Sequence, residues 1–145
     1  RGGDSPAHGE VASFALGLSA GEALELGLES GDGARLREWL AANHAPHDFQ
    51  LPAPLRRLPK LGCQSYRIDG RAVSLLCFQL ADDRLVHLFV VADPPDPPGP
   101  PAAGQARALS HRGQHGLTWR DGGNTYILTG MDMTAAELGR FIQPA

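Results

Sequence analysis

The sequence predicts an α+β domain: a single antiparallel sheet of about five strands, a meander plus a hairpin, with helices packed on one face. The first observation is the block 61–91, the longest stretch rich in apolar, β-branched and aromatic residues. The second is a pair of turn signals, Asp69-Gly70 and Asp121-Gly122-Gly123, each flanked by strand-like segments. The third is an amphipathic segment on either side of these strands.

The first predicted helix runs from Ala34 to about Asn43, with Asp32 as its N-cap. Leu36, Trp39 and Leu40 recur at the spacing of one helix face. We expect this face to lie on the sheet.

The segment before this helix is expected to be a flexible or juxtamembrane arm, residues 1–32, ahead of a single domain at 33–145. Ser19 and Glu22 match a capping box, which predicts a short helix through Leu28. The chain starts at Arg1 without an initiator Met or a charged-then-apolar leader, so we interpret it as a fragment of a longer protein. Its longest apolar run is far shorter than a bilayer span.

Four prolines in His44–Pro59 exclude a regular helix or a central strand and predict an extended connector across the domain surface. Its apolar residues are expected to plug into that surface: Phe49, Leu51 and Leu55. His44 and His47 stand three apart, but a proline between them breaks the helix that would align them on a metal. We therefore interpret both histidines as solvated.

Three strands are predicted in the central block: Gly62–Ile68, Arg71–Leu80 and Arg84–Ala92. Asp69-Gly70 joins the first two, because both central residues of a type I′ turn need positive φ. Leu75–Phe78 is an uninterrupted apolar run. It indicates a strand covered on both faces, or a strand covered by helices on one face and by a partner, such as a second copy of the chain, on the other.

The remaining elements follow a Pro-rich loop, 93–104, whose six prolines indicate an exposed polyproline spacer. Binding of a proline-reading module is the alternative role of this loop. The second hairpin pairs Gly116–Arg120 with Asn124–Gly130. The last helix is predicted from Ala135 to about Gln143, capped by Thr134 with Glu137 at the capping-box position.

Two cysteines, Cys63 and Cys77, are too few for a disulfide scaffold but allow one bridge. A three-residue loop over Asp69–Arg71 would place them directly opposite each other, within disulfide range. A two-residue Asp69-Gly70 loop would place them on opposite faces of the sheet, and the Asp-Gly signal favours this register. The alternative to the bridge is two buried thiols that pack as small apolar groups.

Catalytic motifs are missing from the sequence: it holds no nucleophile elbow, phosphate loop, dinucleotide fingerprint, zinc-protease motif or CxxC pair. We therefore expect that the protein is not an enzyme and that it has no cofactor or metal site. A net charge of −3 without a basic block argues against nucleic acid as a partner. His87 stands out because it lies inside VHLFVV, where a polar ring needs a partner. We interpret it as structural, with pH sensing as the alternative.

Several strings, read together, resemble the extracytoplasmic domain of transmembrane anti-sigma factors. They are REWLAANHAPHDFQLPAPLRRLPKLGCQSYRIDGRAVSLLCF, RLVHLFVV, LTWRDGGNTYILTG and TAAELGRF, and they cover about residues 33–145. In that family a WL helix precedes a Pro-rich connector, a strand opening on Gly, a DGR hairpin and an H-LFV strand. A Pro-rich insertion, a W-DGG-TY hairpin and a terminal helix follow. The paired cysteines depart from the pattern, which has Gly at the first of the two positions.

The resemblance implies a one-pass bacterial membrane protein whose cytosolic part holds a sigma factor inactive. This chain would be the non-catalytic periplasmic part, tethered by a segment before Arg1, that transmits an envelope signal and meets a protein partner in the envelope. The family's His-x-x-x-Cys-x-x-Cys zinc motif has no counterpart here, so the chain alone should not bind a sigma factor. A periplasmic module that binds a peptide or small molecule is the alternative function.

Overall fold

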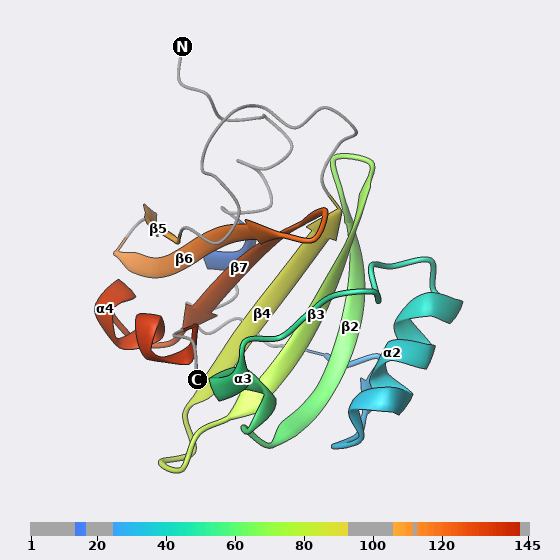
Figure 1. Ribbon diagram of the computed structural model, residues 1–145, viewed down its shortest axis with the longest axis horizontal. Coiled ribbons are helices and arrows are strands. Elements are labelled where there is room, and N and C mark those ends of the chain that lie inside the picture. The colour runs from blue at the N-terminus through green and yellow to red at the C-terminus, as the bar shows by residue number, and fades with distance from the viewer. Residues whose placement is uncertain (1–13, 17–24, 93–105, 112, 143–145) are drawn as a thin grey trace.

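The computed structural model describes residues 14–16, 25–92, 106–111 and 113–142. These residues form an α+β domain, mostly β, built on one antiparallel seven-stranded sheet with a few short helices (Figure 1). The strands are β1 (Leu28–Glu29), β2 (Lys60–Ile68), β3 (Arg71–Gln79), β4 (Leu85–Ala92), β5 (Arg107–His111), β6 (Gln114–Asp121) and β7 (Asn124–Gly130). The helices are α2 (Gly33–Ala42), α3 (Ala53–Arg56) and α4 (Ala135–Leu138), which continues into the 3-10 turn η1 (Gly139–Phe141). None of the described helices is long and apolar enough to cross a bilayer.

The sheet has the order β1-β2-β3-β4-β7-β6-β5, with every neighbouring pair antiparallel. The predicted meander and hairpin are both present, and they join where β4 pairs with β7. β1 and β5 extend the sheet beyond the strands predicted. The helix expected through Leu28 is wrong at its described end, because Leu28 pairs with Cys63 as a strand. Ser19 and Glu22 lie outside the described residues, as does the loop 93–104.

Both hairpin turns have two-residue loops. Asp69 and Gly70 have φ of 53° and 79°, and Gly122 and Gly123 have φ of 61° and 87°. Positive φ at both central residues is the signature of the type I′ turn, whose twist matches that of the flanking strands. The turn prediction is therefore confirmed, with Asp121 paired to Asn124 at the end of the second hairpin rather than inside its loop.

The two predicted helix caps are confirmed. Asp32 accepts a hydrogen bond from the Ala34 amide at 2.9 Å, and Thr134 with Glu137 forms a complete capping box. The last helix is shorter than expected and ends at Leu138 before the 3-10 turn. The expectation that the connector holds no helix is wrong for α3. Pro54 lies in the first turn of α3, where a backbone N–H has no intrahelical partner to lose.

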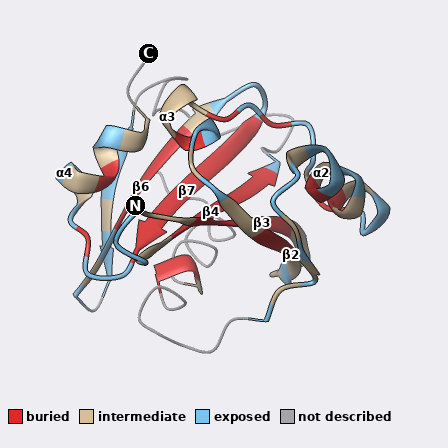
Figure 2. Ribbon diagram, turned by 90° about the horizontal axis from the view of Figure 1, so that it is seen from below, coloured by how far each residue is buried: buried red, intermediate tan, exposed pale blue. Residues whose placement is uncertain are grey.

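The sheet is buried on both faces. Figure 2 shows α2, α3 and α4 on the same side of it. The cluster on that side includes Leu36, Leu40, Leu55, Leu138, Leu76, Phe78, Leu88 and Tyr126. The cluster on the other face contains Ala15, Val73, Leu75, Cys77, Phe89, Val91 and Ile127. Ala15 belongs to a helical turn at 14–16, so helical residues also reach the second face. The Leu75–Phe78 run alternates between the clusters, and one chain therefore buries it on both faces.

The turn between β2 and β3 decides the geometry of the cysteines. Cys63 lies opposite Leu76, and Cys77 lies opposite Gly62. This is the register of the two-residue loop, so the side chains belong to clusters on opposite faces, and both thiols are free. The bridge of the three-residue loop is therefore not formed.

Both thiols are expected to resist alkylation in the native protein. Cys63 and Cys77 are 0% and 1% exposed, and burial raises their pKa to about 11 and about 12, so little thiolate forms at pH 8. Iodoacetamide followed by mass spectrometry should find two unmodified thiols in native protein and two modified ones in urea. Protein that stays unmodified in urea until a reductant is added would contradict this geometry.

Candidate functional site

The connector between α2 and β2 runs across the helix-bearing face and is hydrogen-bonded to two central strands. Ser74 of β3 donates its hydroxyl to the carbonyl of Pro46. Asn124 of β7 donates to the carbonyl of Asp48 at 3.1 Å, and the Gln50 amide donates to the Tyr126 hydroxyl at 3.0 Å. The predicted apolar plugs are confirmed as buried: Phe49, Leu51 and Leu55. The connector is therefore fixed to the sheet both by packing and by hydrogen bonds between its backbone and side chains of the sheet.

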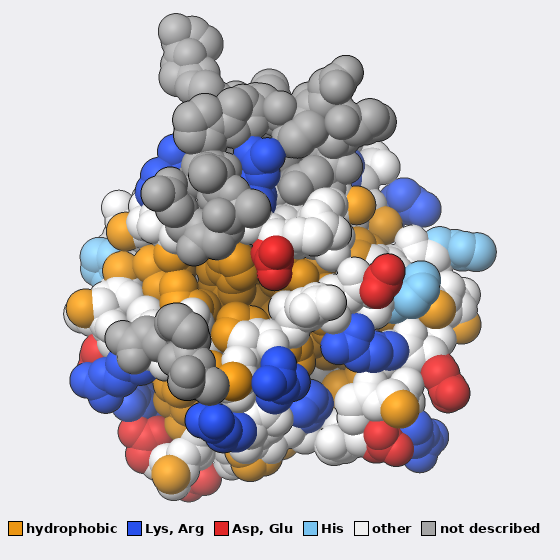
Figure 3. All heavy atoms as spheres, viewed as in Figure 1, with side chains coloured by type: hydrophobic (Ala, Val, Ile, Leu, Met, Phe, Trp, Pro, Cys, Tyr) orange, Lys and Arg blue, Asp and Glu red, His pale blue; other side chains and the backbone are white. Residues whose placement is uncertain are grey.

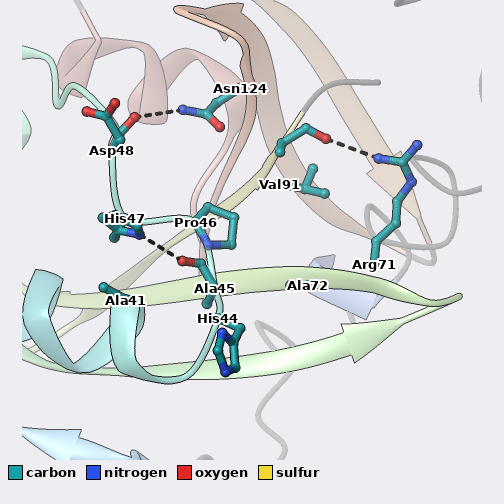
Figure 4. Close-up of a pocket in the computed structure, with 11 residues that line it drawn as sticks. Ala41, His44, Ala45, Pro46, His47, Asp48, Arg71, Ala72, Val91 and Asn124 are labelled. Atoms are coloured by element: carbon teal, nitrogen blue, oxygen red, sulfur yellow. Dashed lines mark hydrogen bonds between the residues drawn. The ribbon is translucent and has the colours of Figure 1, made fainter. Parts of the chain in front are cut away.

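A pocket of about 550 Å³, here called the connector pocket, opens where the connector meets the ends of β3, β4 and β7 (Figure 4). Its polar side chains are His44, His47, Asp48, Arg71 and Asn124, and alanine, proline and valine supply the rest of its lining.

Three of the five polar side chains of the connector pocket, His47, Arg71 and Asn124, are hydrogen-bonded to backbone carbonyls rather than to one another. His47 Nδ1 lies 3.2 Å from the carbonyl of Ala45, and Arg71 donates to the carbonyl of Ala92 at 3.1 Å (Figure 4). The described residues hold no group of three His, Cys, Asp or Glu side chains arranged to bind a metal. His44 and His47 are exposed, in agreement with the interpretation as solvated histidines. This arrangement suits reversible binding of a small polar ligand or a peptide segment.

A second pocket, of about 340 Å³, lies on the other side of the same connector and is here called the cation pocket. It is lined by Arg37 of α2, Arg56 of α3 and Lys60 of β2, with Phe49 and Leu51 of the connector. The sequence did not predict this pocket. Its one local signal is the group of basic residues RRLPK at 56–60, directly after a Pro-rich segment.

His87 lies on β4 at the centre of the sheet, opposite Cys77 of β3 and Thr129 of β7. It is 7% exposed, and its ring centre is 6.4 Å from that of Phe89. Neither ring nitrogen has a hydrogen-bond partner among the described residues, and the same holds for the Thr129 hydroxyl. Burial lowers the pKa of His87 to about 4, so the ring is neutral at pH 7. The partner that a buried polar ring needs is therefore not seen among the described residues.

Removing the Tyr126 hydroxyl is expected to loosen the connector. Tyr126→Phe leaves the Gln50 amide without its acceptor and should cost about 1 kcal/mol of unfolding free energy. Tyr66→Phe is the matched control, because it removes the same hydroxyl from a ring that packs edge-on against Phe14, on the face of the sheet away from the connector. Urea titration of both variants measures the difference. Equal stability of the two variants would show that this hydrogen bond does not fix the connector.

Searches with this chain against protein-family models, curated proteins and solved structures find no match.

Proposed function

We propose that this chain is the extracytoplasmic sensory or regulatory domain of a membrane-anchored anti-sigma factor. The support from sequence is the set of strings that resemble that family. They fall, in order, on α2 with its connector, on the β2–β3 hairpin, on β4, on the β6–β7 hairpin and on α4. Residues of all these elements pack into one cluster on the helix-bearing face.

In this proposal the connector is the segment that responds to a bound ligand. Pro46–Asp48 line the connector pocket, while Phe49 and Leu51 line the cation pocket. The same segment is hydrogen-bonded to β3 and β7. A ligand in either pocket would therefore contact a segment whose position is coupled to two central strands, and such a contact changes the relative stability of connector positions.

The alternative is a binding module of the envelope with no link to transcription. The mixed polar and apolar lining of the connector pocket favours it, because such pockets bind small molecules and peptides in many unrelated proteins. The two functions differ in whether binding alters the activity of a sigma factor.

Membrane topology gives the first test. Cells should express the full-length protein with an epitope inserted at the exposed Gly122-Gly123 turn. Protease added to spheroplasts is expected to remove the epitope while a cytosolic control protein stays intact. An epitope protected until the membrane is permeabilised would contradict an extracytoplasmic position.

A further inference from the structure

We propose that the cation pocket binds an amphiphilic anion: a carboxylate or phosphate group held by Arg37, Arg56 and Lys60, with its apolar chain on the pocket floor. The inference concerns binding by this chain alone. It stands or falls independently of any effect on a sigma factor.

The three cations come from different elements and are held in place by backbone carbonyls. Arg37 donates to the carbonyls of His47 and Phe49, both at 2.9 Å. Arg56 donates to the carbonyl of Leu51 at 2.8 Å, and Lys60 Nζ lies 3.5 Å from the carbonyl of Arg56. A guanidinium has five N–H donors, so these bonds fix each arginine and leave donors for a ligand.

Aromatic rings also position two of the cations. The guanidinium carbon of Arg37 lies 4.3 Å from the centre of the Phe49 ring, and Lys60 Nζ lies 5.8 Å from the centre of the Phe78 ring. Cation–π contacts hold a positive group in place without neutralising its charge. In Figure 3, Lys and Arg side chains gather over α3 and between α3 and α2.

Among the residues that the structure describes, no carboxylate lines the pocket to balance its positive charge. The ion pair between Arg84 and Asp82 lies away from the pocket, in the β3–β4 turn. Asp32, Glu38 and Asp48 each adjoin a lining residue in sequence, but none of them lines the pocket. The Asp32 carboxylate already accepts the Ala34 amide as the α2 cap. Three like charges around one cavity repel one another, and a bound anion relieves that repulsion.

The rest of the pocket is apolar, which is why we infer an amphiphile rather than a free inorganic ion. Leu36, Phe49, Leu51 and Leu76 supply this surface, and all four are buried side chains of the core. A volume of about 340 Å³ is near the lower end for small-ligand sites, so it suits a short acyl or aryl chain. A carboxylate and a phosphate monoester share this chemistry, and the experiment separates them.

Isothermal titration of the purified chain with octanoate and octyl phosphate, each below its micelle concentration, tests the proposal. At least one of them is expected to bind about tenfold more tightly than octanol, acetate or inorganic phosphate. Only an amphiphilic anion contacts both the three cations and the apolar surface of the pocket. Whichever binds more tightly identifies the headgroup. Octanol or octyltrimethylammonium binding as tightly as both anions would overturn the proposal, and so would no measurable binding of either anion.

Variants locate the site. Arg56→Gln and Lys60→Met are each expected to weaken binding about tenfold, because each removes one charged donor. Arg57→Gln changes the neighbouring exposed arginine, which does not line the pocket, and is expected to leave affinity unchanged. Asp32→Asn keeps a good N-cap but removes a negative charge, so binding should tighten about twofold. Equal affinities for Arg56→Gln, Lys60→Met and Arg57→Gln, with circular dichroism showing all three folded, would place binding elsewhere and overturn the assignment.

Discussion

Leu75→Ala and Leu76→Ala are each expected to lower the free energy of unfolding by about 2–5 kcal/mol, the range for emptying a fully buried leucine site. The two residues are neighbours on β3, yet Leu76 belongs to the cluster under the helices and Leu75 to the cluster on the other face. The exposed fraction is 0% for Leu75 and 2% for Leu76. Large losses at two consecutive positions are the mark of a strand that is buried on both faces.

Urea denaturation followed by circular dichroism measures both losses. Met131→Ala is the matched control, because Met131 is 45% exposed and its truncation should change stability by no more than about 0.5 kcal/mol. If Leu76→Ala were costly while Leu75→Ala behaved like Met131→Ala, the second face of the sheet would be open. The two-sided core would then be wrong.

Lowering the pH from about 6.5 to 4 is expected to cost about 3 kcal/mol of stability through His87 alone. Burial lowers the folded-state pKa of His87 from 6.5 to about 4. Between these values the unfolded chain binds a proton that the folded chain does not, so stability falls as the pH falls. Above pH 6.5 the ring is neutral in both states and the loss disappears.

The neighbours of His87 within the described part of the chain are uncharged in this pH range: Cys77 on β3, Thr129 on β7 and Phe89 on its own strand. Hydrogen bonds from the backbone lower the pKa of Asp82 and Glu137, so these carboxylates add to acid destabilisation. Comparison of variants separates the contribution of His87 from that of the two carboxylates.

His87→Leu should remove the His87 loss without weakening the protein at pH 7, because both unpartnered ring nitrogens disappear. His115→Gln, at an exposed position, should keep the loss. Chemical denaturation of the three proteins at pH 7, 5.5 and 4.5 gives the result. A His87→Leu variant with the same pH dependence as the unsubstituted protein would contradict a neutral, buried His87.

Local chemistry explains which elements could be predicted from the sequence. The β2–β3 and β6–β7 hairpins were predictable because Asp69-Gly70 and Gly122-Gly123 encode their own turns. The caps of α2 and α4 were predictable because Asp32 and Thr134 bond within their own helices. Each of these signals acts over two to four residues, and packing was not needed to read it.

The strands at the two edges of the sheet depend on tertiary pairing. β1 is two residues long and exists through its pairing with β2. β5 is exposed at four of its five positions, so it lacks the apolar alternation that marks a half-buried strand. α3 was missed because proline was treated as a helix breaker without regard to its place in the first turn.

The pockets could not be predicted, because they arise from the packing of segments that are distant in the chain. Arg37 lies outside the apolar face of the predicted helix, and nothing in the sequence showed that Phe49 of the connector would lie beneath its guanidinium. For His87, by contrast, the sequence identified the residue and its burial. It did not show that Cys77 and Thr129 would lie opposite His87 on the neighbouring strands without forming a hydrogen bond to its ring.

The central claim, that this domain reports on the envelope to a sigma factor, is tested most directly in cells. The full-length gene should be expressed with each sigma factor of the same genome and a promoter reporter, either intact or with residues 33–142 replaced by a flexible linker of similar reach. We predict that envelope stress changes the reporter signal with the intact protein, and that the linker version fixes the signal at one level. An identical stress response from both versions would contradict the account.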